Sequence, residues 1–235
     1  MEVLRVEISQ AGYTGLQDAV KDICFSLKEE ESIGLIGPNG AGKSTTIKAI
    51  AGLLPEVIGK VEILGEQKCA YIPDQPVFYD ELTLWEHLEL AGAVNEMDHA
   101  VVLEKGEGLL NTFALQKVKH HFPSSFSKGM QQKVMIILGL LMEPDIYIID
   151  EPFVGLDPRA TTQFLHFLQG ERRRGAGVLI STHQLDLAER ICDLIILMME
   201  GRIVARGSLL EIREKCKMPG ASLFDCFNYL LEHEV

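Results

Sequence analysis

Residues 37 to 44 have the types and the spacing of a loop that could hold a phosphate group. They read Gly-Pro-Asn-Gly-Ala-Gly-Lys-Ser, which fits the pattern G-x-x-x-x-G-K-[ST]. Glycine lets the main chain turn its N–H groups toward phosphate oxygens, and a helix starting here presents its positive end to the same anion. Lys43 would add a positive charge, and Ser44 a hydroxyl ligand for magnesium. We predict that the nucleotide contacts the whole loop: Gly37, Pro38, Asn39, Gly40, Ala41, Gly42, Lys43, Ser44 and Thr45.

A second candidate for chemistry is a pair of carboxylates that follows an apolar run. Residues 146–149 read Ile-Tyr-Ile-Ile, and Asp150 and Glu151 come next. Such a run suits a central strand buried on both faces, and open α/β sheets bind ligands at the carboxyl ends of their strands. Asp150 would hold magnesium beside the phosphate loop, and Glu151 would orient or deprotonate a water. The alternative is an acidic strand end in solvent, which the upstream loop makes the weaker interpretation.

Strands and helices alternate along most of the chain, which predicts an α/β sheet with crossover helices. The predicted strands are Val3–Ile8, Ser32–Ile36, Val61–Ile63, Cys69–Ile72, Ile146–Ile149, Val178–Ser181, Leu194–Met199 and Arg202–Ala205. The predicted helices are 42–53, Thr83–Ala93, Ser127–Met142, Thr161–Arg173 and Gln184–Ile191. Residues 76–144 show helical patterns and no strand, so we predict a helical subdomain inserted between core segments 1–75 and 145–217.

The last residues form a predicted helical tail, 218–235. Ser222 with Asp225 resembles a capping box. An apolar stripe at helical spacing follows, made of Leu223, Phe224, Phe227, Leu230 and Leu231. We expect this stripe to pack on its own domain; the alternative is a contact with a partner subunit.

The composition of the chain argues against several classes of protein. The 235 residues are 47% hydrophobic and 24% charged, which is typical of a globular domain. We expect no signal peptide, because the first residues, Met-Glu-Val-Leu-Arg, lack a basic region followed by an apolar stretch. We expect no membrane span, since the longest apolar run has nine residues and a span needs roughly 20. The net charge of −12 argues against a broad nucleic-acid surface. The five cysteines form no C-x-x-C pair, so neither a zinc site nor a disulfide framework is expected.

A family resemblance rests on several further motifs. Residues 127–131 read Ser-Lys-Gly-Met-Gln. They resemble the Leu-Ser-Gly-Gly-Gln signature of ATP-binding cassette (ABC) ATPases, although alone they would read as an ordinary helix N-cap. Residues 155–158, Gly-Leu-Asp-Pro, resemble the D-loop of that family. His183 matches its switch histidine and Tyr13 its adenine-stacking aromatic, both in family order.

The resemblance implies a fold and a mechanism. The fold is a P-loop NTPase ABC cassette with a RecA-like core sheet, an antiparallel β subdomain and the inserted helical subdomain. ATP and Mg²⁺ are the implied ligands, and ATP hydrolysis is the implied activity. Two cassettes would meet head to tail, as a homodimer or a heterodimer. Ser127, Gly129 and Gln131 of one copy would contact the ATP held by the other copy. Glu151 would then act on the attacking water, and His183 on the γ-phosphate.

One position departs from the family pattern. The family's glutamine loop usually reads aromatic-x-Pro-Gln, whereas here Tyr71-Ile72-Pro73 is followed by Asp74, with Gln75 one place later. Either Asp74 or Gln75 takes the position that reaches magnesium or its water.

The predicted function is that of the ATPase subunit of a membrane transporter. The chain resembles bacterial export-type cassettes, including the Ecs type. The resemblance implies integral membrane subunits as partners, no nucleic acid, and a cytoplasmic, peripheral location at the inner face of the cell membrane. The main alternative is an ABC ATPase of a soluble complex, such as one for iron–sulfur cluster assembly. A nucleic-acid-associated cassette is disfavoured by the charge, and a binding module without turnover by the presence of Asp150, Glu151 and His183.

Overall fold

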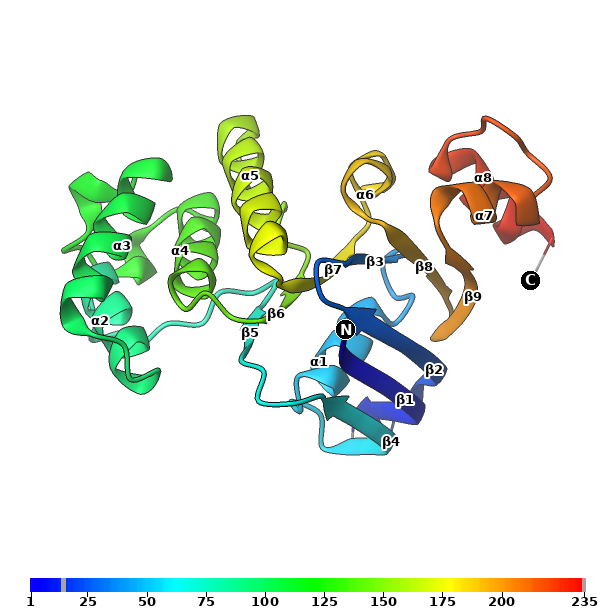
Figure 1. The fold of residues 1–235 in the computed structure, drawn as a ribbon, viewed down its shortest axis with the longest axis horizontal. Helices are drawn as coiled ribbons and strands as arrows, with labels where there is room; N and C mark the ends of the chain where they lie inside the picture. Colours follow the sequence, from blue (N-terminus) through cyan, green and yellow to red (C-terminus); the bar gives the residue numbers. More distant parts are fainter. Residues whose placement is uncertain (14–15, 234–235) are drawn as a thin grey trace.

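Two β-sheets organise the chain, which is described here by a computed structural model (Figure 1). The structure describes residues 1–13 and 16–233. Residues 14–15, in the predicted cassette domain, and 234–235, in the predicted tail, lie outside the described residues. The larger sheet has six strands in the order β5-β6-β7-β3-β8-β9, all parallel except β9. Its strands are β3 (Ser32–Ile36), β5 (Cys69–Ile72), β6 (Ile146–Asp150), β7 (Gly177–Thr182), β8 (Leu194–Met199) and β9 (Arg202–Gly207).

The second sheet is antiparallel and has the order β2-β1-β4. It contains β1 (Glu2–Tyr13), β2 (Leu16–Lys28) and β4 (Glu56–Ile63). The sequence analysis missed β2 because its buried side chains change phase. Val20 and Ile23 are both buried but stand three positions apart, with exposed Asp22 at φ 54° between them. A strict alternation of apolar and polar residues, the usual signal of a strand, is therefore broken.

The two faces of the six-stranded sheet bury different sets of side chains. Tyr147 and Ile149 of β6 pack into a cluster with the helices on one side. Ile146 and Ile148 pack on the other side, against α1 (Lys43–Ile50) and the antiparallel sheet. Since side chains alternate along a strand, the unbroken apolar run of β6 serves both layers. The central strands are thus held from both faces, which fixes their carboxyl ends.

Helices fill the segment between β5 and β6, which contains no strand. They are α2 (Leu84–Val94), α3 (His99–Thr112), two short 3₁₀ turns (Gln116–Val118 and Pro123–Ser125) and α4 (Lys128–Leu141). Figure 1 shows them together at the end of the molecule away from the antiparallel sheet. Helix α3 was not predicted, because Gly106 and Gly108 lower its helix propensity. The domain boundaries drawn at residues 75 and 145 stay a prediction.

The remaining helices follow β6 along the chain. They are α5 (Pro158–Arg174), α6 (Leu185–Ile191), α7 (Leu209–Lys215) and α8 (Leu223–His233). Helix α8 begins with the Ser222–Asp225 hydrogen bonds and buries Leu223, Phe227 and Leu230 against α6, α7 and β8. Most of the predicted stripe therefore packs on its own chain, whereas Phe224 is 53% exposed.

Helix α8 offers a matched pair of phenylalanines for a stability test. We expect Phe227→Ala to lower the free energy of unfolding by about 3 kcal/mol or more, since it leaves a cavity in a packed cluster. Phe224→Ala, on the exposed side of the same helix, should cost less than about 1 kcal/mol. Urea denaturation followed by circular dichroism measures both. Equal losses would show that α8 is not packed as described.

Candidate functional site

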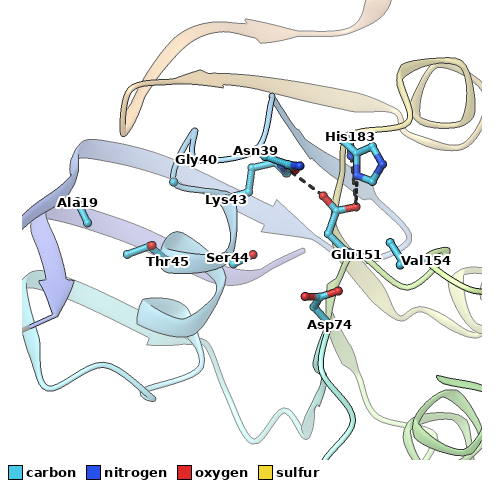
Figure 2. A pocket seen from close by; sticks show the side chains of 11 residues that line it. Ala19, Asn39, Gly40, Lys43, Ser44, Thr45, Asp74, Glu151, Val154 and His183 are labelled. Atoms are coloured by element: carbon cyan, nitrogen blue, oxygen red, sulfur yellow. Dashed lines mark hydrogen bonds and ion pairs between the residues drawn. The ribbon is translucent and has the colours of Figure 1, made fainter. Parts of the chain in front are cut away.

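Four neighbouring parallel strands bring their carboxyl ends to one edge of the sheet. Strand β3 leads into the phosphate loop, and β6 ends at Asp150. His183 directly follows β7, and Asp74 lies two residues after the end of β5. A cavity of about 540 Å³ lies at this edge, and part of it is drawn in Figure 2. Its lining residues are Ala19, Asn39, Gly40, Gly42, Lys43, Ser44, Thr45, Asp74, Glu151, Val154 and His183.

The phosphate loop follows a path that only glycine accommodates at two points. Gly42 has φ 97°, and a Cβ there would lie 2.6 Å from Val20 Cγ1. A Cβ on Gly37 would lie 2.4 Å from the carbonyl oxygen of Met198. Gly42 is also the N-cap residue of α1, so the loop leads directly into the positive end of a helix. The local chain is thereby shaped for an anion.

The Lys43 side chain is 5% exposed and is surrounded by oxygen atoms. Its Nζ donates to the carbonyl oxygens of Gly37, at 2.8 Å, and Pro38, at 3.2 Å. The Oε1 atom of Glu151 lies 3.3 Å from the same nitrogen. This ion pair balances a buried ammonium that would otherwise be costly.

Asp150 is 1% exposed and accepts two hydroxyl hydrogen bonds on one oxygen. Ser44 Oγ donates to Oδ1 at 3.0 Å, and Ser181 Oγ donates to it at 2.5 Å. The other oxygen, Oδ2, is buried without a hydrogen-bond partner. A buried carboxylate oxygen without a partner beside a serine hydroxyl is a set of hard oxygen donors, which fits Mg²⁺.

Glu151 adopts a strained main-chain conformation, with φ 46°. Two hydrogen bonds hold its N–H, one to the Ser181 carbonyl at 3.2 Å and one to Ser181 Oγ at 3.1 Å. Both oxygens of its carboxylate have a partner. Oε2 accepts a hydrogen bond from His183 Nδ1 at 2.9 Å, and Oε1 forms the ion pair with Lys43 (Figure 2). The carboxylate is therefore fixed in the cavity rather than turned to solvent.

Of the two candidates left open by the glutamine-loop pattern, Asp74 lines the cavity and Gln75 does not. Asp74 is half-buried, and Gln75 is exposed. Burial raises the pKa of the Asp74 carboxyl, and the nearby charges of Asp150 and Glu151 raise this pKa further. Asp150 thus has a second acidic neighbour besides Glu151 at this edge.

Four further predicted site residues do not line this cavity: Tyr13, Ser127, Gly129 and Gln131. Tyr13 is the last residue of β1 and is 40% exposed. Ser127 is exposed at the N-cap of α4 and accepts from the Met130 N–H at 3.4 Å. Gly129 touches the loop after Glu151, since a Cβ there would lie 2.3 Å from the Gly155 carbonyl oxygen. Gln131 donates through Nε2 to the Pro123 carbonyl at 2.9 Å. One chain thus presents the signature segment outside its own phosphate cavity.

The sequence analysis missed Ser181 as a site residue. Its hydroxyl bonds Asp150, and it also receives the Glu151 N–H, so it supports both carboxylates. A serine inside a strand gives no signal of its own. The pairing of Asp150 with Ser181 between β6 and β7 is what brings these groups together.

Comparisons with known proteins agree on one family. Residues 20–154 match the family described as ABC transporter. An uncharacterized ABC transporter ATP-binding protein of Bacillus subtilis (strain 168), YthP, is 46% identical over 225 residues, covering 96% of this chain and 95% of YthP. The ABC-type transporter ATP-binding protein EcsA of the same organism is 42% identical over 244 residues, covering 100% of this chain and 98% of EcsA.

Solved structures agree with these relatives. A structure described as the ATP binding subunit of an ABC transporter is 43% identical, has a TM-score of 0.91, and covers 97% of this chain and 99% of its own. A nucleotide-free ATP-binding cassette from an ABC transporter, at 24% identity and a TM-score of 0.75, supports the fold alone and covers 97% of this chain and 99% of its own. The cassette fold predicted from the sequence is therefore confirmed.

Ser181 provides a test of how the carboxylates are held. We expect Ser181→Ala to lower the free energy of unfolding by about 1–3 kcal/mol, because it removes two buried hydrogen bonds and leaves the Glu151 N–H with a single acceptor. Ser125→Ala removes one exposed hydroxyl bond to the Phe122 carbonyl, and it should stay within about 0.5 kcal/mol of the parent. Denaturant titration of both variants measures these changes in the free energy of unfolding. A Ser181→Ala chain as stable as the parent would contradict the described network.

Proposed function

The chain belongs to the ATP-binding proteins of ABC transporters, and we propose that it hydrolyses ATP to drive transport through separate membrane subunits. The observation that carries this proposal is the convergence of Lys43, Asp150, Glu151 and His183 at one edge of the sheet. A cation, two carboxylates and an imidazole beside a phosphate loop are groups that can neutralise phosphate charge, hold a metal and position a water for phosphoryl transfer.

Lys43 and the loop would bind the phosphates of ATP. The main-chain N–H groups of the loop and of the start of α1 would donate hydrogen bonds to the phosphate oxygens, and the Lys43 ammonium would turn to the β- and γ-oxygens. Lys43 now faces Oε1 of Glu151. Phosphate oxygens competing for Lys43 would therefore leave that carboxylate oxygen free for another partner.

Glu151 would accept a proton from the attacking water. The water oxygen would form its bond to the γ-phosphorus as the bond to the β,γ-bridging oxygen breaks, giving ADP and phosphate. The His183 contact to Oε2 would keep Glu151 in position during this step. His183 also lines the cavity, which supports the predicted contact of its ring with the γ-phosphate.

Magnesium would be held by the hydroxyl of Ser44 and the carboxylate of Asp150, with Asp74 on the same side of the cavity. The metal would neutralise phosphate charge and leave the chemistry of the proton to Glu151. Asp74, rather than Gln75, is the favoured glutamine-loop residue because it is the one that lines the cavity.

A second cassette would complete the site. Ser127, Gly129 and Gln131 do not line the cavity of their own chain. Ser127 is exposed at the start of α4, where a hydroxyl and free N–H groups suit a γ-phosphate from another molecule. The phosphate needs charge neutralised on several sides. These features support the head-to-tail pairing that the sequence predicts.

Membrane subunits are the proposed partners. The relatives YthP and EcsA are named as ATP-binding proteins of transporters. Among the helices that the structure describes, none combines the length and apolar character needed to cross a bilayer. From the family resemblance, we propose that the chain acts from the cytoplasmic face, on subunits that supply the membrane-spanning path.

Replacing the proposed base tests both hydrolysis and dimer formation. Glu151→Gln should lower kcat for ATP hydrolysis by about 100-fold or more, since a general base contributes 10²–10⁴. With ATP and magnesium present, this variant should accumulate as a dimer in size-exclusion chromatography with light scattering. Adding Lys43→Ala should abolish the dimer by removing phosphate binding, and Lys48→Ala on the same helix is the matched control. A Glu151→Gln chain that turns over ATP like the parent excludes the proposed base.

A pull-down from native cells in mild detergent tests the transport assignment. We expect a multi-spanning membrane protein to copurify in stoichiometric amount with the tagged chain, identified by mass spectrometry. Hydrolysis of ATP by the purified chain should be unaffected by the tag. A soluble partner with no membrane protein would overturn the transport assignment and favour the alternative of a soluble complex, while leaving the ATPase chemistry in place.

A further inference from the structure

The imidazole of His87 is a buried polar group that the proposed mechanism does not use. His87 lies in the first turn of α2 and is 6% exposed. Both ring nitrogens have partners. Nδ1 lies 2.8 Å from the carbonyl oxygen of Thr83, and Nε2 lies 3.0 Å from the main-chain nitrogen of Tyr79.

These partners determine which ring nitrogen carries the proton. A carbonyl oxygen can only accept, so Nδ1 must donate to Thr83. An amide N–H can only donate, so Nε2 must accept from Tyr79. His87 therefore acts as a neutral imidazole in the Nδ1–H form. The ring of Phe78 packs edge-on against the imidazole at 5.5 Å between centroids, which fixes its orientation further.

Residues 73–83 form the loop that the imidazole holds, and this loop connects β5 to α2. At its start, Asp74 lines the phosphate cavity; farther along, Val77 and Tyr79 are 75% and 63% exposed. Among the described residues, the loop has one internal main-chain hydrogen bond, from the Leu82 N–H to the Tyr79 carbonyl. An irregular loop with so little internal bonding depends on contacts with its surroundings for its shape.

We propose that His87 is a positioning residue that holds the β5–α2 loop through the Tyr79 amide and so keeps the Asp74 carboxylate beside Glu151. We call the hydrogen bond between the Tyr79 N–H and His87 Nε2 the clamp. The clamp itself rests on the geometry alone, whereas its effect on catalysis rests on the proposed function. Asp74 is five residues from Tyr79, close enough along the chain for a fixed Tyr79 to limit where Asp74 can go. Figure 2 shows the Asp74 carboxylate on the same side of the cavity as Glu151.

The clamp is tested without nucleotide by NMR on the full chain. The ring nitrogen shifts of His87 should identify the Nδ1–H form, and the Tyr79 amide should exchange slowly with solvent. His87→Phe keeps an aromatic ring but removes both hydrogen bonds, so it should speed exchange at Tyr79 by about tenfold or more. His87→Gln can place its side-chain oxygen near the former Nε2 and should restore slow exchange. An Nε2–H ring, or unchanged exchange in His87→Phe, overturns the clamp.

The consequence for the reaction is tested by steady-state ATP hydrolysis. His87→Phe should lower kcat by about tenfold and leave KM for ATP within about twofold, because the phosphate loop is untouched. His87→Gln should recover at least half of the parent kcat, and His99→Gln, at an exposed position of α3, is the control. A His87→Phe chain with fast Tyr79 exchange and parental kcat would refute the positioning role. If the parent itself does not hydrolyse ATP, the proposed function fails. The clamp is then tested only by the rate at which the Tyr79 amide exchanges with solvent.

Discussion

The buried charge of Lys43 is the constraint on which the arrangement of this site depends. An ammonium that is 5% exposed needs compensating oxygens close by, and an unpaired buried charge would cost several kcal/mol. Two of these oxygens, from Gly37 and Pro38, belong to its own loop. The negative charge comes from Glu151, more than a hundred residues later in the chain. Strands β3 and β6 must therefore end at the same edge of one sheet, with β7 between them, and the burial of these strands on both faces maintains that alignment.

The balance of charges at this edge favours a bound cation. Three carboxylates, those of Asp74, Asp150 and Glu151, share the edge with one buried lysine, and the pKa of Asp74 is raised in part by the other two. Such a cluster would repel the phosphates of a nucleotide unless positive charge accompanied them. The partnerless Oδ2 of Asp150 is the position where a hard cation gains most, since no protein donor competes for it. In the proposed function, a cation bound with the nucleotide would offset the repulsion between the acidic cluster and the phosphates.

Features encoded by a few adjacent residues could be predicted from the sequence, and features created by pairing could not. The apolar run of β3 and the loop after it carry their own signals, and the predicted strand has the observed bounds. Strand β2 was missed because its apolar alternation slips at Asp22, and α3 because Gly106 weakens the helical pattern. Asp74 lines the cavity and Gln75 does not, and this depends on the path of the main chain after β5. Ser181 gained its role only when β7 paired with β6, a contact between segments about thirty residues apart that no local pattern reports.

The helical segment contacts the loops of the site from more than one helix, and these contacts could couple events at the site to the positions of the helices. His87 of α2 fixes the loop that carries Asp74, and Gly129 of α4 packs against Gly155 in the loop that follows Glu151. Both contacts are close: the Tyr79 nitrogen lies 3.0 Å from His87 Nε2, and a methyl group added at Gly129 would lie 2.3 Å from the Gly155 carbonyl oxygen. A ligand that fixes one arrangement of Asp74 and Glu151 would then also favour one placement of α2 and α4. If nucleotide bound one such placement more tightly than another, its binding would shift the helices toward that placement. The surface that these helices present to a partner would then shift with them.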